Sequence, residues 1–291
     1  EACFREWISD LAGVVAGVVA IDGKTACGSR DGHNTALHTV SAYATASGLC
    51  LGQEHTRGKG HEIPAIKALL DTLALKGCIV TIDAIGCQTE IARKILDRGG
   101  DYLLAVKDNQ KDLADALREF FADGEPRGFG SLPVSRFQSL EKDHGRIETR
   151  QAIWVADLSW LDKKLREHWP KLAGLGMIER QREINGAVST ERAYYIGSQG
   201  IKSAESFAKA ARDHWGIENN LHWVLDITFR EDDCRVRKGH APHNFAALRK
   251  FALALLRKDT QFPKRSLRSR RKTAERLPDY RASLLGLSSR S

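Results

Sequence analysis

The sequence lacks the features that mark membrane-spanning, disulfide-rich and zinc-bound proteins. Its longest apolar run, from Leu11 to Ile21, has eleven residues and includes two glycines, whereas a membrane-spanning helix needs about 20 apolar residues. The six cysteines are widely spaced and form no Cys-x-x-Cys pair, so neither a disulfide framework nor a zinc cage is expected. We therefore expect a cytoplasmic chain with reduced thiols and no contact with a membrane.

Several common catalytic motifs are also missing. No Gly-x-Ser-x-Gly elbow and no His-Glu-x-x-His pair occurs, which leaves serine hydrolases and zinc proteases without support. Gly17, Gly23, Lys24 and Thr25 resemble a phosphate-binding P-loop, but five residues separate the two glycines where that motif requires four. Nucleotide binding through a P-loop is therefore not expected.

The composition is that of a folded, basic protein. Hydrophobic residues make up 42% of the 291 residues and charged residues 28%, a balance typical of globular chains. Lysine and arginine together number 45 against 37 aspartates and glutamates, which gives a net charge of +8. Such a charge favours a polyanionic partner, and nucleic acid is the first expectation.

The order of predicted elements indicates an α/β fold. Strand patterns occur at residues 14–21, 37–45, 49–55, 78–83 and 102–106. Helical spacing follows the third, fourth and fifth of them, so the order is β-β-β-α-β-α-β-α. Three antiparallel strands followed by alternating helices and strands form the layout of the RNase H-like fold, a mixed sheet flanked by helices.

A change of pattern divides the chain into segments. From residue 123 to 202, glycine and proline recur and alternating segments predict a β-rich insertion. The core, residues 14–122, is expected to resume at 203–258, where helical spacing returns. Because residue 1 is glutamate and not methionine, residues 1–13 are expected to be the remnant of a longer N-terminal region. Residues 259–291 are rich in lysine and arginine and are expected to form a flexible basic tail.

Two aspartates occupy equivalent places at the ends of predicted strands. Asp22 ends the first strand and Asp83 the fourth, and small residues follow both. A single aspartate at such a place is most often a turn former, but neighbouring strand ends can bring two carboxylates together. A third carboxylate from a late helix would complete a pocket for divalent cations.

The late helix offers several candidates for that third carboxylate. Glu218, His222 and Asp226 recur at a spacing of four and so share one helix face, while the acidic run at 231–233 is a rival near the helix end. Asp226 would lie about 12 Å beyond Glu218 at a rise of 1.5 Å per residue, too far to share a metal pair. We therefore expect Glu218, which the helix interior holds firmly, to be the ligand.

Five ordered stretches of the chain resemble one known family. They lie at residues 20–25, 81–88, 100–110, 144–148 and 214–226. In these stretches the chain is similar to the H-repeat-associated family of bacterial insertion-sequence transposases, over residues 14–256. The resemblance implies a DDE transposase with an RNase H-like catalytic core and two Mg²⁺ or Mn²⁺ ions. Carried over by position, the catalytic and metal-binding triad is Asp22, Asp83 and Glu218.

The chain departs from the wider signature of related transposases around the helical glutamate. Those proteins carry a tyrosine, an arginine and a lysine at fixed offsets, where this sequence has Ala211, His214 and Leu225. The resemblance to that wider signature is therefore partial.

The resemblance also implies DNA as the partner, both as transposon ends and as target. We further expect a homodimer on DNA and association with the nucleoid. Candidate phosphate contacts lie beyond strand ends, in the insertion and in the basic tail. They are Lys24, Lys107, His144, Arg146, Lys264, Arg265, Arg268, Arg270 and Arg271. Lysines at strand ends are also common as solubilising groups, and a salt-bridged surface strand explains Arg146 equally well.

Two alternatives to an active transposase stay open. The first is a DNA-binding relic that keeps the fold but no longer cleaves, which the presence of all three acidic residues opposes. The second is a stand-alone metal-dependent nuclease, which would cleave DNA without joining strands.

Overall fold

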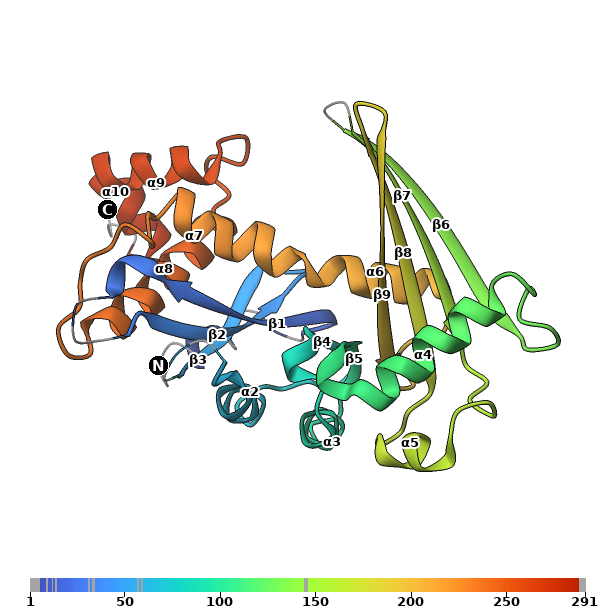
Figure 1. Cartoon of the computed structure of the whole chain (residues 1–291). Coiled ribbons are helices and arrows are strands. Elements are labelled where there is room, and N and C mark those ends of the chain that lie inside the picture. The colour runs from blue at the N-terminus through green and yellow to red at the C-terminus, as the bar shows by residue number, and fades with distance from the viewer. Residues whose placement is uncertain are drawn as a thin grey trace.

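The structure is a computed structural model, and it describes residues 6–8, 10–11, 13, 15–30, 32, 35–56, 58, 60–143 and 146–287. In this part of the chain nine strands form one mixed sheet (Figure 1). The strands are β1 (Gly17–Ala26), β2 (Leu37–Ala44), β3 (Leu49–Thr56), β4 (Cys78–Ile82), β5 (Asp101–Val106), β6 (Val134–Asp143), β7 (Arg146–Val155), β8 (Gly174–Ile184) and β9 (Ala187–Gly197).

Helices connect and cover these strands. The α-helices are α2 (Glu62–Leu70), α3 (Thr89–Asp97), α4 (Lys111–Gly124), α5 (Lys163–His168), α6 (Ala204–His214), α7 (Trp223–Ile227), α8 (Ala241–Lys258), α9 (Leu267–Arg276) and α10 (Pro278–Leu284). Short turns are η1 (Cys27–Ser29), η2 (Ala84–Gly86), η3 (Asp108–Gln110) and the π-helical η4 (Glu218–His222). Among the described residues, no helix is both long and apolar enough to cross a membrane.

The first five strands have the topology expected from the sequence. β1 runs antiparallel to β2 and parallel to β4, and β5 continues the sheet parallel to β4. The strand order 3-2-1-4-5, with α2 after β3 and α3 after β4, is that of the RNase H-like fold. The predicted fold class, a mixed sheet flanked by helices, is therefore confirmed.

β1 is longer than predicted, and this changes the setting of Asp22. The expected end of the strand at Asp22 is wrong, because β2 pairs with β1 as far as Ala26. The parallel pairing with β4 does stop earlier, at Ile21 and Ile82. Asp22 therefore lies where β1 loses its parallel neighbour, beside the carboxyl end of β4.

Helices cover both faces of the core sheet (Figure 1). Ile21 belongs to the apolar cluster that contains Ile66 of α2, whereas Ala20 belongs to the cluster that contains Leu221 on the opposite face. Side chains alternate between the two faces of a strand. Asp22 is therefore directed to the face of Ala20, which is the face that the helical segment from α6 to α7 covers.

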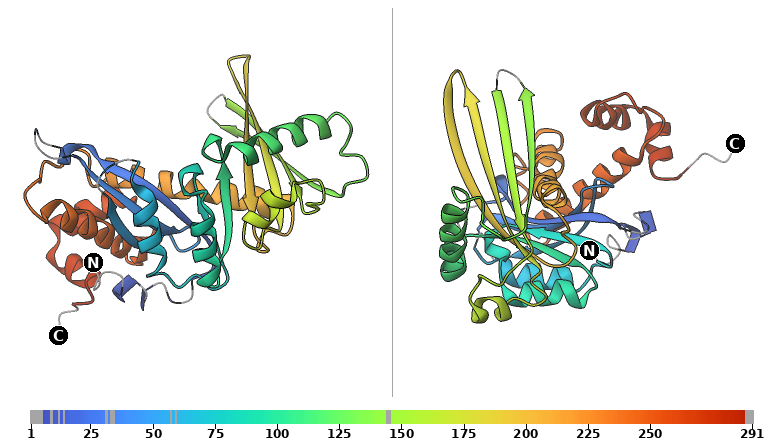
Figure 2. Two further views of the ribbon diagram at one scale, coloured as in Figure 1. Left: turned by 60° about the horizontal axis from the view of Figure 1, so that its bottom comes forward. Right: turned by 90° about the vertical axis from the view of Figure 1, so that its right-hand side faces the viewer.

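The β-rich insertion extends the core sheet. Strands β6 to β9 are antiparallel to one another, and β9 pairs antiparallel with β5, from Leu103 opposite Gly197 to Val106 opposite Tyr194. Figure 2 shows the far ends of these strands projecting well beyond the core. The inner ends pack on α6 through Trp154 and Phe207, whose ring centroids lie 5.1 Å apart.

The expectation of a flexible tail is wrong for residues 259–287. Helices α9 and α10 form there, and Ser266 caps α9 by accepting a hydrogen bond from the backbone N–H of Ser269. The guanidinium of Arg270 donates to the carbonyl oxygen of Leu256, 2.8 Å away, at the end of α8. The buried Tyr280 hydroxyl donates to Asp259 over 2.8 Å. These contacts fold the basic segment onto α8.

Candidate active site

The segment from α6 to α7 contains a π-helical turn at the position of Glu218. After α6 ends at His214, turn η4 begins at Glu218, and the N–H of Trp223 donates to the carbonyl oxygen of Glu218, five residues earlier. Such turns are rare and occur often at functional sites. Here the turn keeps Leu221 buried against the sheet while Glu218 is 57% exposed.

Asp22, Glu218 and His222 meet at one place. Nδ1 of His222 lies 3.4 Å from a carboxylate oxygen of Glu218 and 3.5 Å from one of Asp22. One ligand-type atom from each of the three residues lies within 4.8 Å of the other two. The predicted pairing of Asp22 with Glu218 is therefore present in the geometry, and it includes a histidine.

Asp83 approaches the same group from the other side. It follows β4 directly and precedes η2, and it lines a small cavity of about 20 Å³ together with Asp22 and Glu62. Burial raises the pKa of Asp83, and the nearby Glu62 carboxylate adds to this rise. The volume is close to that of one water molecule or one small ion.

The electrostatics of Asp22 show that acidic groups are crowded here. Burial raises the pKa of Asp22 to about 7, and the charges of Asp83 and Glu218 add to the increase, although the Gly23 N–H donates to its carboxylate over 2.8 Å. A divalent cation would relieve this repulsion. Burial also lowers the pKa of His222, so its neutral imidazole can act as a ligand. The residues present therefore fit divalent cations.

Sequence reasoning missed two features of the site. These are the presence of Glu62 and the position of His222 between the carboxylates of Asp22 and Glu218. Glu62 is the first residue of α2, and its carboxylate lies 2.7 Å from Nε2 of the buried His38. Nδ1 of His38 lies 2.7 Å from the hydroxyl oxygen of Thr25 on β1. The available signal for Glu62 was a carboxylate at the start of the helix that follows β3.

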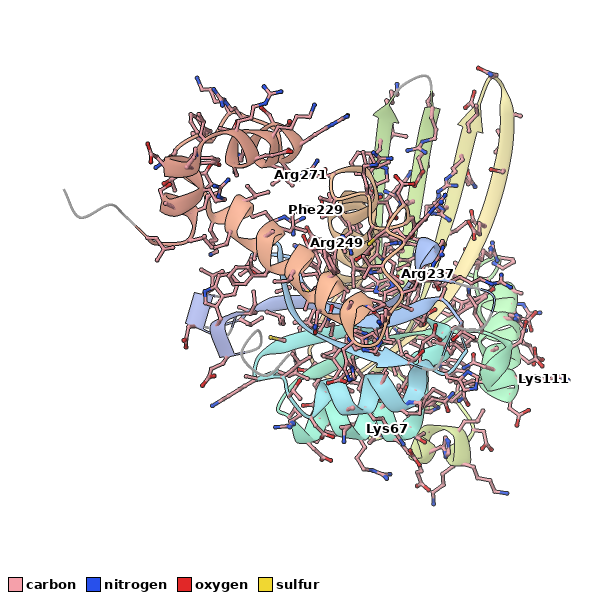
Figure 3. All side chains as sticks on the ribbon, turned by 90° about the vertical axis from the view of Figure 1, so that its left-hand side faces the viewer. Lys67, Lys111, Phe229, Arg237, Arg249 and Arg271 are labelled. Atoms are coloured by element: carbon pink, nitrogen blue, oxygen red, sulfur yellow. The ribbon has the colours of Figure 1, made fainter. Side chains whose placement is uncertain are left out.

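The rival acidic residues are engaged elsewhere. Nζ of Lys24 lies 2.7 Å from Asp226, 3.3 Å from Asp232 and 3.8 Å from Glu231. Arg249 of α8, labelled in Figure 3, lies 3.8 Å from Glu231 on the other side. Because Lys24 is only 11% exposed and is surrounded by carboxylates, its interpretation as a phosphate contact is not supported.

His214 replaces a cation of the related transposases with a neutral group. Its Nδ1 lies 3.0 Å from the hydroxyl oxygen of Thr81 on β4. Burial lowers the pKa of His214 to about 4. At neutral pH the ring therefore carries no charge, and its contact with Thr81 links α6 to β4.

The remaining predicted DNA contacts are distributed over several surfaces. Lys107 is exposed directly after β5, close enough to Asp83 to oppose in part the rise in its pKa. Arg146 is exposed and lies 3.8 Å from the buried Glu148, which also binds Arg150 and Arg182. His144 lies outside the described residues. In the C-terminal segment Lys264, Arg265 and Arg268 are exposed, whereas Arg270 and Arg271 are partly buried.

Comparisons of this chain with family models and with individual proteins agree on one family. The model described as "Transposase DDE domain" matches residues 15–255. YbfL of Escherichia coli K12 is 39% identical over 97% of this chain and 75% of its own length. The "H repeat-associated putative transposase YhhI" of the same strain is 39% identical over the same shares. YncI of E. coli O157:H7, also named as a transposase, is 40% identical over 88% of this chain and 66% of its own length.

Among solved structures, a piggyBac transposase synaptic complex with hairpin DNA matches 96% of this chain and 59% of that chain. The TM-score is 0.41 at 9% identity. The family match spans most of the chain, and the relatives named above confirm the resemblance to H-repeat-associated proteins. This chain belongs to the family of proteins with a transposase DDE domain.

Proposed function

We propose that this chain is an active DDE transposase that cleaves DNA at the ends of an insertion sequence and joins them to a target. The observation that carries the proposal is the approach of Asp22, Asp83 and Glu218 from three distant segments of a chain in this family. Asp22 lies close enough to the other two carboxylates for the charges of Asp83 and Glu218 to raise its pKa.

The three carboxylates would hold two divalent cations, Mg²⁺ or Mn²⁺. When bound, the ions would supply activation of the attacking oxygen and stabilisation of the leaving oxygen in an in-line displacement. The chain positions Asp22 through the hydrogen bond from the Gly23 N–H. The exposed Glu218 leaves the site open on one side, where a phosphodiester can approach.

The proposed partner is DNA, and we also propose that the chain forms a homodimer on DNA. The DNA partner is supported by the net charge of +8 and by exposed cations near the carboxylates and on α9. Among the predicted phosphate contacts, Lys107 is close enough to Asp83 for its charge to lower the pKa of that carboxyl. Intact, grouped carboxylates favour an active enzyme over the DNA-binding relic.

A joining assay tests the proposal. The full chain is incubated with Mg²⁺ or Mn²⁺, a labelled duplex carrying the inverted repeats that flank its gene, and a supercoiled target plasmid. We expect labelled ends covalently joined to the plasmid. Cleavage without joined product would identify a nuclease, and DNA binding without cleavage would identify the relic.

A further inference from the structure

The two sides of the carboxylate group differ in chemistry. The acidic residues that line the cavity beside Asp83 are Asp22, Asp83 and Glu62, and its other lining residues are apolar apart from glycine. On the other side of Asp22, the neighbours are one carboxylate, Glu218, and one imidazole, His222. A cation beside Asp83 would have the carboxylates of Asp83 and Glu62 as candidate ligands. A cation beside Glu218 would meet the imidazole nitrogen of His222 as well as carboxylate oxygens.

His222 has the geometry of a ligand. Its Nδ1 lies 3.4 and 3.5 Å from the oxygens of Glu218 and Asp22. Ligand atoms about 2.1 Å from one ion lie about 3.0 Å apart in octahedral and about 3.4 Å apart in tetrahedral coordination. The two distances from His222 are thus close to those between atoms that share one ion, and the ligand atoms of all three residues lie within 4.8 Å of one another.

The remaining contacts of His222 point to the same role. The residue is 6% exposed, and in the described structure its buried Nε2 has no hydrogen-bond partner. The ring is therefore held by packing, and its polar contacts are the two carboxylates. His214, one turn before Glu218, contrasts with it because Nδ1 of that ring lies 3.0 Å from Thr81.

We propose that His222 is a metal ligand, which makes the ion position at Glu218 a mixed nitrogen–oxygen site that prefers Mn²⁺ to Mg²⁺. The proposal rests on the metal-binding part of the proposed function and goes beyond the carboxylate triad. Its chemical basis is that imidazole suits transition-metal ions, whereas Mg²⁺ prefers oxygen ligands.

Pulsed electron paramagnetic resonance of Mn²⁺ tests this assignment directly. Mn²⁺ bound to the full-length wild-type chain should show coupling to an imidazole ¹⁴N nucleus. His222→Asn places an amide near the position of Nδ1, so it should remove the imidazole coupling and lower Mn²⁺ affinity about tenfold or more. Its Mg²⁺ affinity should change far less. His214→Asn is the matched control and should keep both the coupling and the affinity.

The outcomes separate this proposal from the proposed function. A wild-type protein that cleaves DNA with Mn²⁺ but shows no imidazole coupling overturns the role of His222 and leaves the transposase proposal intact. Coupling that persists in His222→Asn also overturns it. If the wild type binds no Mn²⁺, both proposals fail. If circular dichroism shows that His222→Asn does not fold, Asp22→Asn is used in its place. Imidazole coupling to Mn²⁺ that is present in the wild type and lost in Asp22→Asn then supports the proposal.

Discussion

Lys24 and Asp226 form an ion pair of 2.7 Å that joins β1 to α7. Lys24 lies two residues after Asp22, and Asp226 lies four residues after His222. The pair therefore fixes how the strand that carries Asp22 meets the helical segment that carries Glu218 and His222. We therefore assign Lys24 and Asp226 a structural role, which differs from the chemical role proposed for Asp22 and Glu218.

Asp226→Asn should weaken the fold and spare the chemistry. The substitution removes one charge from the ion pair, but Lys24 retains Asp232 at 3.3 Å. Because Asp226 is 30% exposed and burial raises its pKa, the cost of burial offsets part of the ion pair, and we expect a loss of at most about 1 kcal/mol in the free energy of unfolding. Urea denaturation measures this loss, and cleavage at saturating metal should stay near the wild-type rate. A variant of normal stability without cleavage would place Asp226 in the catalytic machinery.

Glu218→Gln should have the opposite effect. Its side chain is largely exposed, so stability should hardly change, but loss of a charged ligand should lower the cleavage rate about 10²–10³-fold. Asp22→Asn and Asp83→Asn should match it, with DNA affinity retained in a gel-shift assay. The control is Glu231→Gln, which alters a buried carboxylate near Lys24 and Arg249 and should keep most of the cleavage. Near-normal cleavage by Glu218→Gln would show that the third ligand lies elsewhere.

The contribution of Asp22 to the stability of the metal-free chain should fall as pH rises from 4 to 7. Burial raises the pKa of Asp22 from 3.8 to about 7 in the folded chain. The folded state therefore binds more protons than the unfolded state between these values, and ionisation at higher pH destabilises the fold. The difference between the urea midpoints of the wild type and Asp22→Asn should show this trend between pH 5 and pH 7. The comparison with the variant is needed because burial lowers the pKa of His214 to about 4, so that ring changes stability in the opposite direction in both proteins. Mn²⁺ should reverse the trend by stabilising the ionised carboxylate.

Asp22→Asn supplies the control for that pH dependence. The amide cannot ionise, so the variant should gain stability relative to the metal-free wild type as pH rises and should be the more stable protein at pH 8. A difference between the two proteins that does not change with pH would mean that Asp22 does not cause the effect.

DNA affinity should depend on the exposed cations of the C-terminal segment. Replacing Lys264, Arg265 and Arg268 by alanine should weaken binding and reduce the dependence of log affinity on log salt by about 0.9 for each lost phosphate contact. Arg270→Ala should instead lower the melting temperature, because Arg270 holds the end of α8. Fluorescence anisotropy at several salt concentrations measures the first effect. An unchanged slope in the triple variant would exclude this segment from the DNA interface.

Local patterns were enough to predict the core of the fold. Buried β-branched runs and helices with regular apolar spacing identify β1 to β5 and their connecting helices, because each signal lies within a few residues. The end of β1 was missed since it depends on β2, whose pairing reaches Ala26. The folded C-terminal segment was missed for a similar reason. Arg270 and Tyr280 anchor it through contacts with Leu256 and Asp259, which composition alone does not reveal.

The sequence predicted those residues of the candidate site that follow a predicted strand. Asp22 and Asp83 directly follow Ile21 and Ile82, the last paired residues of two neighbouring parallel strands, a relationship that sequence order reveals. The spacing of Glu218 and His222 placed both on one helix face, but the π turn between them is not visible in the sequence. The position of Glu62 depends on how α2 crosses the sheet, so it required the three-dimensional structure.

The pairing of β9 with β5 joins the projecting strands directly to the core sheet. Backbone hydrogen bonds connect β4 to β5, β5 to β9, and β9 to β8. At about 3.3 Å per residue, the eleven residues of β8 or of β9 span about 36 Å. The tips of β8 and β9 therefore cannot change their distance from the carboxylates unless the sheet itself bends or twists.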